Sequence, residues 1–69
     1  MDDRRPQRYE LSARERQVMT LAATGLPNKT IGHALGLSAG TVQNHLHNIY
    51  QKLGVANRTA AAMVHERKA

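Results

Sequence analysis

The stretch Ser38 to Leu53 reads S-A-G-T-V-Q-N-H-L-H-N-I-Y-Q-K-L, and the rest of the chain is organised around it. An α-helix turns by about 100° per residue, and on that scale its regularly spaced apolar residues fall within roughly 40° of Val42. These residues are Val42, Leu46, Ile49 and Leu53. Their i, i+4, i+7, i+11 spacing predicts one helix with a continuous apolar face that packs against a core.

The opposite face of this predicted helix has an unusual composition for a solvent-exposed surface. Such faces are normally rich in Lys and Glu, whereas this one has no carboxylate and mainly amide and imidazole groups. Its members are Gly40, Gln43, Asn44, His47 and Gln51. By itself the face fits either a surface for a partner or a plain solvated surface, and the rest of the chain has to distinguish the two.

Length and composition exclude several classes of protein. A chain of 69 residues holds one small domain, and without cysteine it has neither a disulfide framework nor a thiolate metal site. The apolar runs are too short to span a membrane, and the N-terminus lacks the apolar segment of a signal peptide. We therefore expect a cytoplasmic protein with no membrane partner and no cofactor, stabilised by helix packing.

The charge distribution favours an anionic partner. The net charge is +5, and the block from Arg16 to His65 contains no acidic residue. A surface without carboxylates can approach nucleic acid without local repulsion, although solubility or an acidic protein partner would explain the same charge. Two tyrosines and no Phe or Trp provide few aromatic platforms for unpaired bases, which favours duplex DNA.

Caps and glycines divide the chain into four predicted helices. Residues 1–10 are charged and aperiodic, so we interpret them as a solvated lead-in or a linker remnant before one domain at 11–69. The predicted helices cover residues 13–24, 28–35 and 39–53, and a fourth follows Val55 and Ala56. The expected N-caps are Ser12 (with Glu15 completing a capping box), Asn28, Ser38 and either Asn57 or Thr59, and the expected stops are Gly25, Gly36 and Gly54.

The predicted helices carry enough apolar residues for a small core, so the fold class is all-α with four short helices. Beside the apolar face of helix 39–53, the expected core consists of Val18, Met19, Leu21, Ala22, Ile31, Ala34, Leu35, Ala60, Ala61, Met63 and Val64. A short helix, a tight turn at Gly36 and Leu37, and a longer helix form the pattern of a helix-turn-helix. An ordinary pair of antiparallel helices shares that pattern.

Four segments of the chain occur in a characteristic order and spacing: L-S-A-R-E-R-Q-V-M at 11–19, G-L-P-N-K-T-I at 25–31, L-G-L-S-A-G-T-V-Q-N-H at 35–45 and I-Y-Q-K-L-G-V-A-N-R-T at 49–59. They resemble the LuxR/NarL-type helix-turn-helix domain, and the resemblance extends from residue 11 to about 65. The resemblance implies a bacterial transcription regulator whose helix 39–53 enters the major groove of DNA. Members of this family usually follow a receiver or ligand-sensing domain, which makes the chain a response regulator effector domain or a stand-alone regulator.

Gln43, Asn44 and His47 are the candidates for direct base readout. They lie together on the predicted wheel, opposite the apolar face, and similar positions face bases in the family that the chain resembles. The family very often has lysine where this chain has Gln43, so a positive charge is missing here. An amide most naturally reads adenine N6 and N7, and affinity is then expected to come largely from contacts to phosphates.

Contacts to the DNA backbone are expected from basic and hydroxyl residues at helix ends. Ser38 and Thr41 lie at the start of helix 39–53, where backbone N–H groups also suit a phosphate oxygen. The candidates are Lys29, which resembles a phosphate clamp of the family, together with Ser38, Thr41, Gln51, Lys52 and Arg58. Glu15 is expected to form an ion pair with Lys52 or Arg58, away from DNA.

The histidine pair at 45 and 47 invites a metal interpretation, which the helix geometry disfavours. Residues two apart lie about 200° apart on a helix and cannot share an ion. His45 flanks the apolar face, so we expect a packed, hydrogen-bonded side chain and no metal site.

The fourth predicted helix, which contains Ala60 to Val64, also suggests that the chain binds a second copy of itself. Small and apolar residues there, with Ala61, Met63 and Val64 as candidates, would allow a homodimer that is weak off DNA. RNA polymerase is a further candidate partner.

A function of a different class is also open, in which the fold serves as a small adaptor or anti-activator that binds protein instead of DNA. An enzyme is disfavoured because the chain has no activated nucleophile, no phosphate-binding glycine loop and too little length to enclose a cleft.

Overall fold

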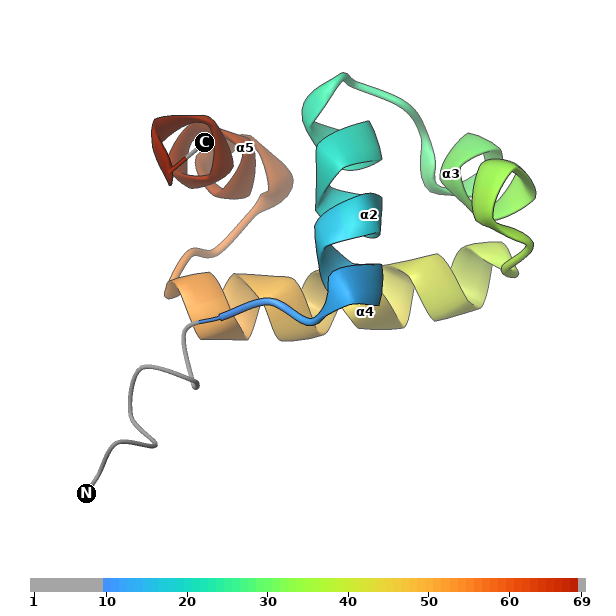
Figure 1. The fold of residues 1–69 in the computed structure, drawn as a ribbon, viewed down its shortest axis with the longest axis horizontal. Coiled ribbons are helices and arrows are strands. Elements are labelled where there is room, and N and C mark those ends of the chain that lie inside the picture. The colour runs from blue at the N-terminus through green and yellow to red at the C-terminus, as the bar shows by residue number, and fades with distance from the viewer. Residues whose placement is uncertain (1–9, 69) are drawn as a thin grey trace.

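The computed structural model describes residues 10–68, which form four α-helices and no strand over that range. The helices are α2 at Ala13–Ala23, α3 at Asn28–Leu35, α4 at Ala39–Leu53 and α5 at Arg58–Lys68. The long helix α4 runs along one side of the molecule, with α2 standing on its middle and α3 and α5 to either side of α2 (Figure 1). The predicted all-α fold with a central helix-turn-helix, α3 to α4, is confirmed. The predicted lead-in falls mostly outside the described residues.

The start of α2 is fixed by the predicted capping box. The Ser12 Oγ atom accepts a hydrogen bond from the Glu15 backbone N–H at 3.1 Å, and the Glu15 Oε1 atom accepts one from the Ser12 N–H at 2.8 Å. Two N–H groups that the helix itself cannot satisfy are paired in this way. The helix ends at Ala23, with Thr24 as its C-cap.

The start of α3 differs from the prediction. Pro27 occupies the N-cap position with no side-chain cap, so Asn28 is the first residue of the helix and the prediction that it caps α3 is wrong. Its side chain is instead hydrogen-bonded to two residues far along the chain, Gln43 and Arg58.

The caps of α4 and α5 are residues that the sequence predicts as caps. The Ser38 Oγ atom accepts from the Thr41 N–H at 3.0 Å, and the Asn57 Oδ1 atom accepts from the Ala60 N–H at 2.9 Å, which selects Asn57 over Thr59. Gly54 ends α4 at φ 70°, in the left-handed region that glycine enters without strain.

The core lies where α2, α4 and α5 meet and continues to α3. Its buried apolar residues are Val18, Met19, Ala22, Ile31, Val42, Leu46, Ile49 and Ala61. The apolar face predicted for α4 is confirmed, with Leu53 partly buried at its end. Two expected core positions are wrong, because Ala34 is exposed and Met63 is 56% exposed. Met63 lies two residues from the buried Ala61, and this step turns it to the opposite side of α5.

Gly32 takes the place in the α3 core face that Ala34 was expected to fill. It is buried, and a Cβ atom there would collide with the backbone carbonyl oxygen of Leu37 in the turn. The Leu37 N–H donates to the Gly32 carbonyl oxygen at 2.7 Å. The close approach of α3 to the turn that leads into α4 therefore depends on the missing side chain.

Candidate nucleic-acid interface

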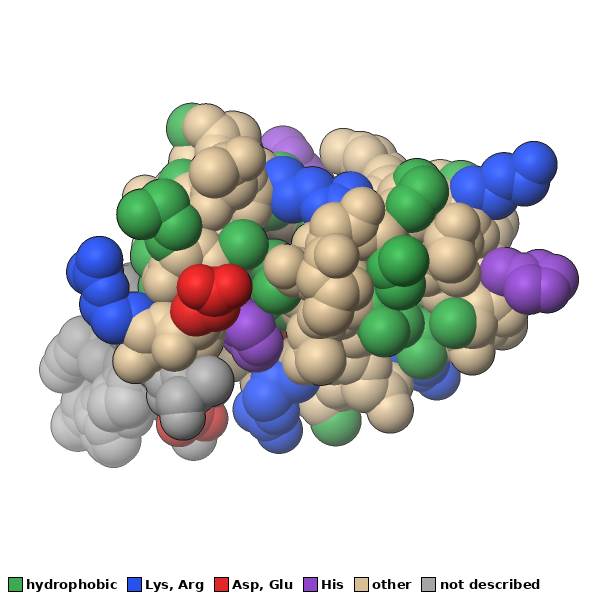
Figure 2. All heavy atoms as spheres, turned by 90° about the horizontal axis from the view of Figure 1, so that it is seen from above, with side chains coloured by type: hydrophobic (Ala, Val, Ile, Leu, Met, Phe, Trp, Pro, Cys, Tyr) green, Lys and Arg blue, Asp and Glu red, His purple; other side chains and the backbone are tan. Residues whose placement is uncertain are grey.

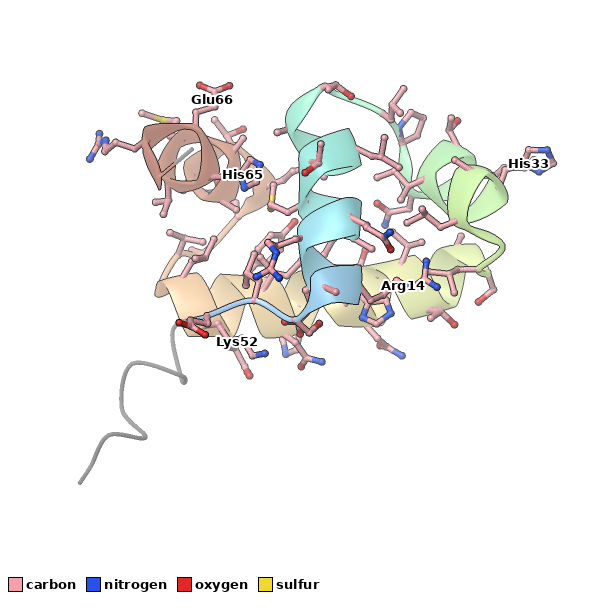
Figure 3. The ribbon with its side chains drawn as sticks, viewed as in Figure 1. Arg14, His33, Lys52, His65 and Glu66 are labelled. Atoms are coloured by element: carbon pink, nitrogen blue, oxygen red, sulfur yellow. The ribbon has the colours of Figure 1, made fainter. Side chains whose placement is uncertain are left out.

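The outer face of α4 presents the predicted polar residues to solvent. Gln43, Asn44, His47 and Gln51 are all exposed, and they lie opposite the buried apolar face of the same helix. Side chains of α4 project from the side of the molecule that faces away from α2 and α5 (Figure 3). The structure thus brings the three proposed base-reading residues together on one rigid, capped helix.

The N-terminal turn of α4 offers hydroxyl groups beside its first backbone N–H groups. The Ser38 hydroxyl accepts from the Thr41 N–H and donates to the Thr41 Oγ1 atom at 2.9 Å. No acidic side chain occurs in this first turn. The positive end of the helix dipole is therefore left uncompensated by carboxylates, which suits an anionic ligand.

Gln43 is already held by a hydrogen bond from α3. The Asn28 Nδ2 atom donates to the Gln43 Oε1 atom at 2.8 Å. The Asn28 Oδ1 atom in turn accepts from Arg58 Nη1 at 3.4 Å. Sequence reasoning missed this role of Asn28, because its partners lie in other helices and no local pattern signals them.

Arg58 is directed inward. Its Nε and Nη2 atoms donate to the backbone carbonyl oxygen of Ala22 at 3.3 and 3.2 Å, and Nη2 also donates to the carbonyl oxygen of Leu26. These bonds tie the start of α5 to the end of α2 and to the segment that leads into α3. Arg58 was expected at the DNA backbone, and this geometry gives it a structural role instead.

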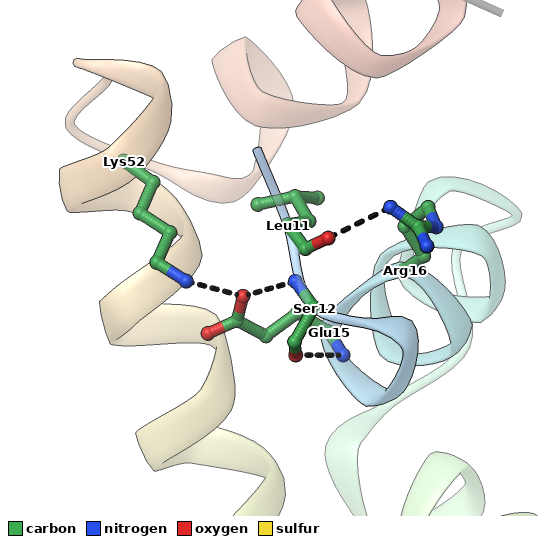
Figure 4. Close-up of polar contacts among 5 residues, drawn as sticks. All are labelled: Leu11, Ser12, Glu15, Arg16 and Lys52. Atoms are coloured by element: carbon green, nitrogen blue, oxygen red, sulfur yellow. Dashed lines mark hydrogen bonds and ion pairs between the residues drawn. The ribbon is translucent and has the colours of Figure 1, made fainter. Parts of the chain in front are cut away.

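Lys52 also makes an internal contact. Its Nζ atom lies 2.8 Å from the Glu15 Oε1 atom, in an ion pair between α4 and α2 (Figure 4). The expected pairing of Glu15 with a basic residue is thus found with Lys52 and not with Arg58. A phosphate contact by Lys52 stays a prediction, and it would have to compete with this pair.

The environment of Glu15 stabilises its ionised form. Burial is the largest single influence and raises the pKa of this carboxyl, but four lowering influences together outweigh it: the hydrogen bond from Lys52, the Ser12 backbone N–H, the Lys52 charge and the Ser12 hydroxyl. The pKa of Glu15 is therefore lowered from its ordinary value.

Lys29 is exposed in the first turn of α3. No side chain caps this helix start, and its first turn contains no acidic residue. The ammonium group and the first N–H groups of α3 are therefore both accessible to an anion.

The two histidines of α4 differ in their surroundings. His47 is exposed, and its Nε2 atom lies 3.3 Å from the Gln51 Nε2 atom, one turn further along. His45 is partly buried, as expected, but it makes no side-chain hydrogen bond within residues 10–68. Over the described part of the chain, no group of His, Cys, Asp and Glu side chains could hold a metal ion.

The dimer candidates on α5 do not share one surface. Ala61 is fully buried in the core, so its assignment to an interface is wrong. Met63 is exposed and Val64 partly buried. Only Met63 presents a large apolar side chain to solvent among the described residues.

The side of the molecule away from α4 has a mixed surface. Figure 2 views this side and shows acidic, basic and hydrophobic side chains interspersed. Glu66 projects there from α5, while His33 points outward from α3 (Figure 3). None of the helices in residues 10–68 is long and apolar enough to cross a membrane.

The family model described as bacterial regulatory proteins, luxR family, matches residues 9–65. The chain belongs to the luxR family of bacterial regulatory proteins. The resemblance predicted from the four sequence motifs is confirmed. The chain therefore carries a DNA-binding, LuxR-type helix-turn-helix domain of transcription regulation.

Individual relatives agree with this family. The protein named "Putative HTH-type transcriptional regulator YhjB" of Escherichia coli is 54% identical over 54 residues, covering 78% of this chain and 27% of that protein. The "Uncharacterized transcriptional regulatory protein YhcZ" of Bacillus subtilis is 44% identical over 62 residues, covering 90% of this chain and 29% of the relative. The "HTH-type transcriptional regulator MalT" of Vibrio cholerae is 41% identical over 56 residues, 81% of this chain and 6% of its own length. The chain spans just over a quarter of the first two proteins.

Proposed function

We propose that this domain binds duplex DNA sequence-specifically, with α4 in the major groove and Gln43, Asn44 and His47 at the base edges. The observation that carries the proposal is the outer face of α4, where these exposed side chains lie together opposite the buried apolar face. A helix of this kind fits the major groove, and hydrogen bonds to base edges there distinguish all four base pairs.

Contacts to phosphates supply most of the affinity in this proposal. Lys29 provides the charge, while Ser38 and Thr41 provide hydroxyl groups beside the N–H groups of the first turn of α4. Gln51 lies further along the same face of α4 and is proposed to contact the DNA backbone as well. Lys52 and Arg58 serve the fold first, since their donors already bind Glu15 and backbone carbonyl groups.

The regulator that contains this domain is proposed to act in the bacterial cytoplasm, on the nucleoid, without catalysis and without a cofactor. A homodimer would place two copies of α4 on two half-sites, with the exposed Met63 and the neighbouring Val64 of α5 at the contact. RNA polymerase is a proposed further partner, and a receiver or sensor domain is a proposed neighbour in the same regulator.

A selection of bound sequences from random duplexes tests the proposal. We expect a defined motif, binding that weakens steeply with salt, and a two-fold symmetric site where two domains bind. Retention of no duplex at low salt would contradict DNA binding and favour the adaptor function. Sedimentation of the domain on a duplex with two half-sites then measures the dimer, and a monomer on that duplex would remove the proposed contact through α5.

A further inference from the structure

The hydrogen bonds between α5, α3 and α4 determine which end of the Gln43 amide faces outward. Arg58 has only N–H donors, so the Asn28 atom that faces it has to be the acceptor Oδ1. The other end of that amide, Nδ2, then faces Gln43 and donates to its Oε1 atom at 2.8 Å. The Gln43 Oε1 atom is thereby directed toward α3, and the donor end of the amide, Nε2, is the end turned away from Asn28.

This chain of bonds starts from a fixed point. Arg58 is partly buried and donates to the carbonyl oxygen of Ala22 through both Nε and Nη2, so its guanidinium plane is held at two positions. A rotation of the Asn28 amide by 180° would bring Nδ2 against Arg58 and Oδ1 against the Gln43 oxygen. Both contacts would then be unfavourable, which fixes the orientation of the Asn28 amide.

The hydrogen bond between Asn28 and Gln43 is expected to persist when the domain binds DNA. In the free domain it is exposed to water, which competes for both groups. At an interface that excludes water, breaking the bond would leave the Asn28 N–H or the Gln43 oxygen without a partner, and an unpaired buried polar group is costly.

We propose that Asn28 is a positioning residue that determines specificity, by holding the Nε2 atom of Gln43 toward the DNA. The inference rests on the proposed function of the α4 face. A glutamine that reads adenine needs both amide atoms, to accept from N6 and donate to N7. With Oε1 directed toward Asn28, Gln43 presents the donors of Nε2 on the side away from α3, and guanine presents two acceptors, O6 and N7, on one edge. Gln43 therefore favours guanine, whereas the residue type alone suggests adenine.

The test begins with the base position that Gln43 reads. The position is found as the one in the selected motif at which the Gln43→Ala variant loses its preference. Competition with duplexes that differ only in that base pair then measures the order of preference. For the unmodified domain we expect guanine to exceed adenine by about two- to tenfold, which is the effect of one net hydrogen bond.

The Asn28→Asp variant is expected to invert that order. A carboxylate can only accept, so it keeps the bond from Arg58 and now accepts from the Gln43 Nε2 atom. The Gln43 Oε1 atom then faces outward and favours the donors adenine N6 and cytosine N4. The matched control is Thr30→Asp, which adds the same charge to the exposed face of α3 and should lower affinity without changing the order of bases.

If the Asn28→Asp variant fails to fold, as judged by the loss of its helical circular dichroism signal, the Asn28→Ala variant provides the test instead. Asn28→Ala releases Gln43 to present both amide atoms, so adenine should rise relative to guanine. An unmodified domain that prefers adenine, or Asn28 variants that keep the original order, would overturn the positioning role. If Gln43→Ala changes the preference at no position, base readout by Gln43 itself fails, and with it that part of the proposed function.

Discussion

Glu15 joins the start of α2 to the end of α4 through one carboxylate oxygen. Its Oε1 atom accepts from the Ser12 N–H and from Lys52, each at 2.8 Å. The carboxylate has 8% of its side chain exposed and Lys52 has 34%. The pair is therefore screened by water on the lysine side only, and we expect it to contribute about 1 kcal/mol.

The Glu15→Gln variant tests this contribution and its pH dependence. Glutamine can still accept from the Ser12 N–H, so the variant removes mainly the ion pair and should lower the free energy of unfolding by about 1 kcal/mol at neutral pH. Because the folded pKa of Glu15 is lowered, its contribution is complete above the ordinary pKa of a glutamate carboxyl and is lost as the pH falls through the lower pKa of the folded state. Urea unfolding should show the two proteins converging in acid. A difference that stays constant down to acid pH would contradict the account.

Lys29 is expected to contribute to the affinity for DNA through its charge, but not to the choice of DNA sequence. In the Lys29→Ala variant, the slope of log K against log salt should become shallower by about one unit, and binding should weaken equally on selected and random duplexes. The control is Arg67→Ala, which removes an exposed cation from α5, a helix that contributes none of the proposed base-reading residues. A salt dependence equal to that of the unmodified domain would show that Lys29 does not touch DNA.

At the scale of elements, the packing of α3 against the turn before α4 depends on Gly32. The buried glycine leaves room for the Leu37 carbonyl group, and the Leu37 N–H donates to the Gly32 oxygen at 2.7 Å. This contact sets how α3 and α4 are placed relative to each other. An added methyl group has to displace backbone, which costs more than the displacement of a side chain.

Two glycine substitutions should therefore have opposite effects on stability. Gly32→Ala is expected to lower the free energy of unfolding by about 1–3 kcal/mol. Gly40→Ala on α4 is the matched control, since a Cβ atom there would meet only the Ser38 Oγ atom at 3.9 Å. It should stabilise the helix by about 0.5 kcal/mol. Thermal unfolding of both variants measures these effects. If the unfolding temperatures of the two variants shift in the same direction, the packing described for Gly32 is contradicted.

For the molecule as a whole, the fold was predictable wherever the signal is local. The capping box at Ser12 and the caps at Ser38 and Asn57 join residues three apart, and the apolar face of α4 repeats along one helix. The buried face of the alanine-rich α5 was harder to predict, because this helix has weak apolar periodicity and small residues on several sides. That weakness explains why Ala61 and Met63 were both expected in the core and both named as dimer candidates, whereas the structure buries Ala61 and exposes Met63.

The candidate site was predictable only in part, for the same physical reason. A helical wheel finds the exposed face of α4, because the face is a property of one helix. The orientation of Gln43 depends on Asn28, 15 residues away, and on Arg58, which is 30 residues from Asn28. Such contacts exist only after α3, α4 and α5 have packed, so a local pattern cannot show them.

Base readout by the outer face of α4 is the central claim, and the binding of the Gln43→Ala variant to two duplexes tests it most directly. Gln43 is exposed and outside the core, so its replacement should leave the unfolding temperature nearly unchanged. On the selected site we expect a loss of about 1–3 kcal/mol in binding free energy, with little change on a random duplex of equal length at the same salt concentration. An equal loss on both duplexes would contradict the account.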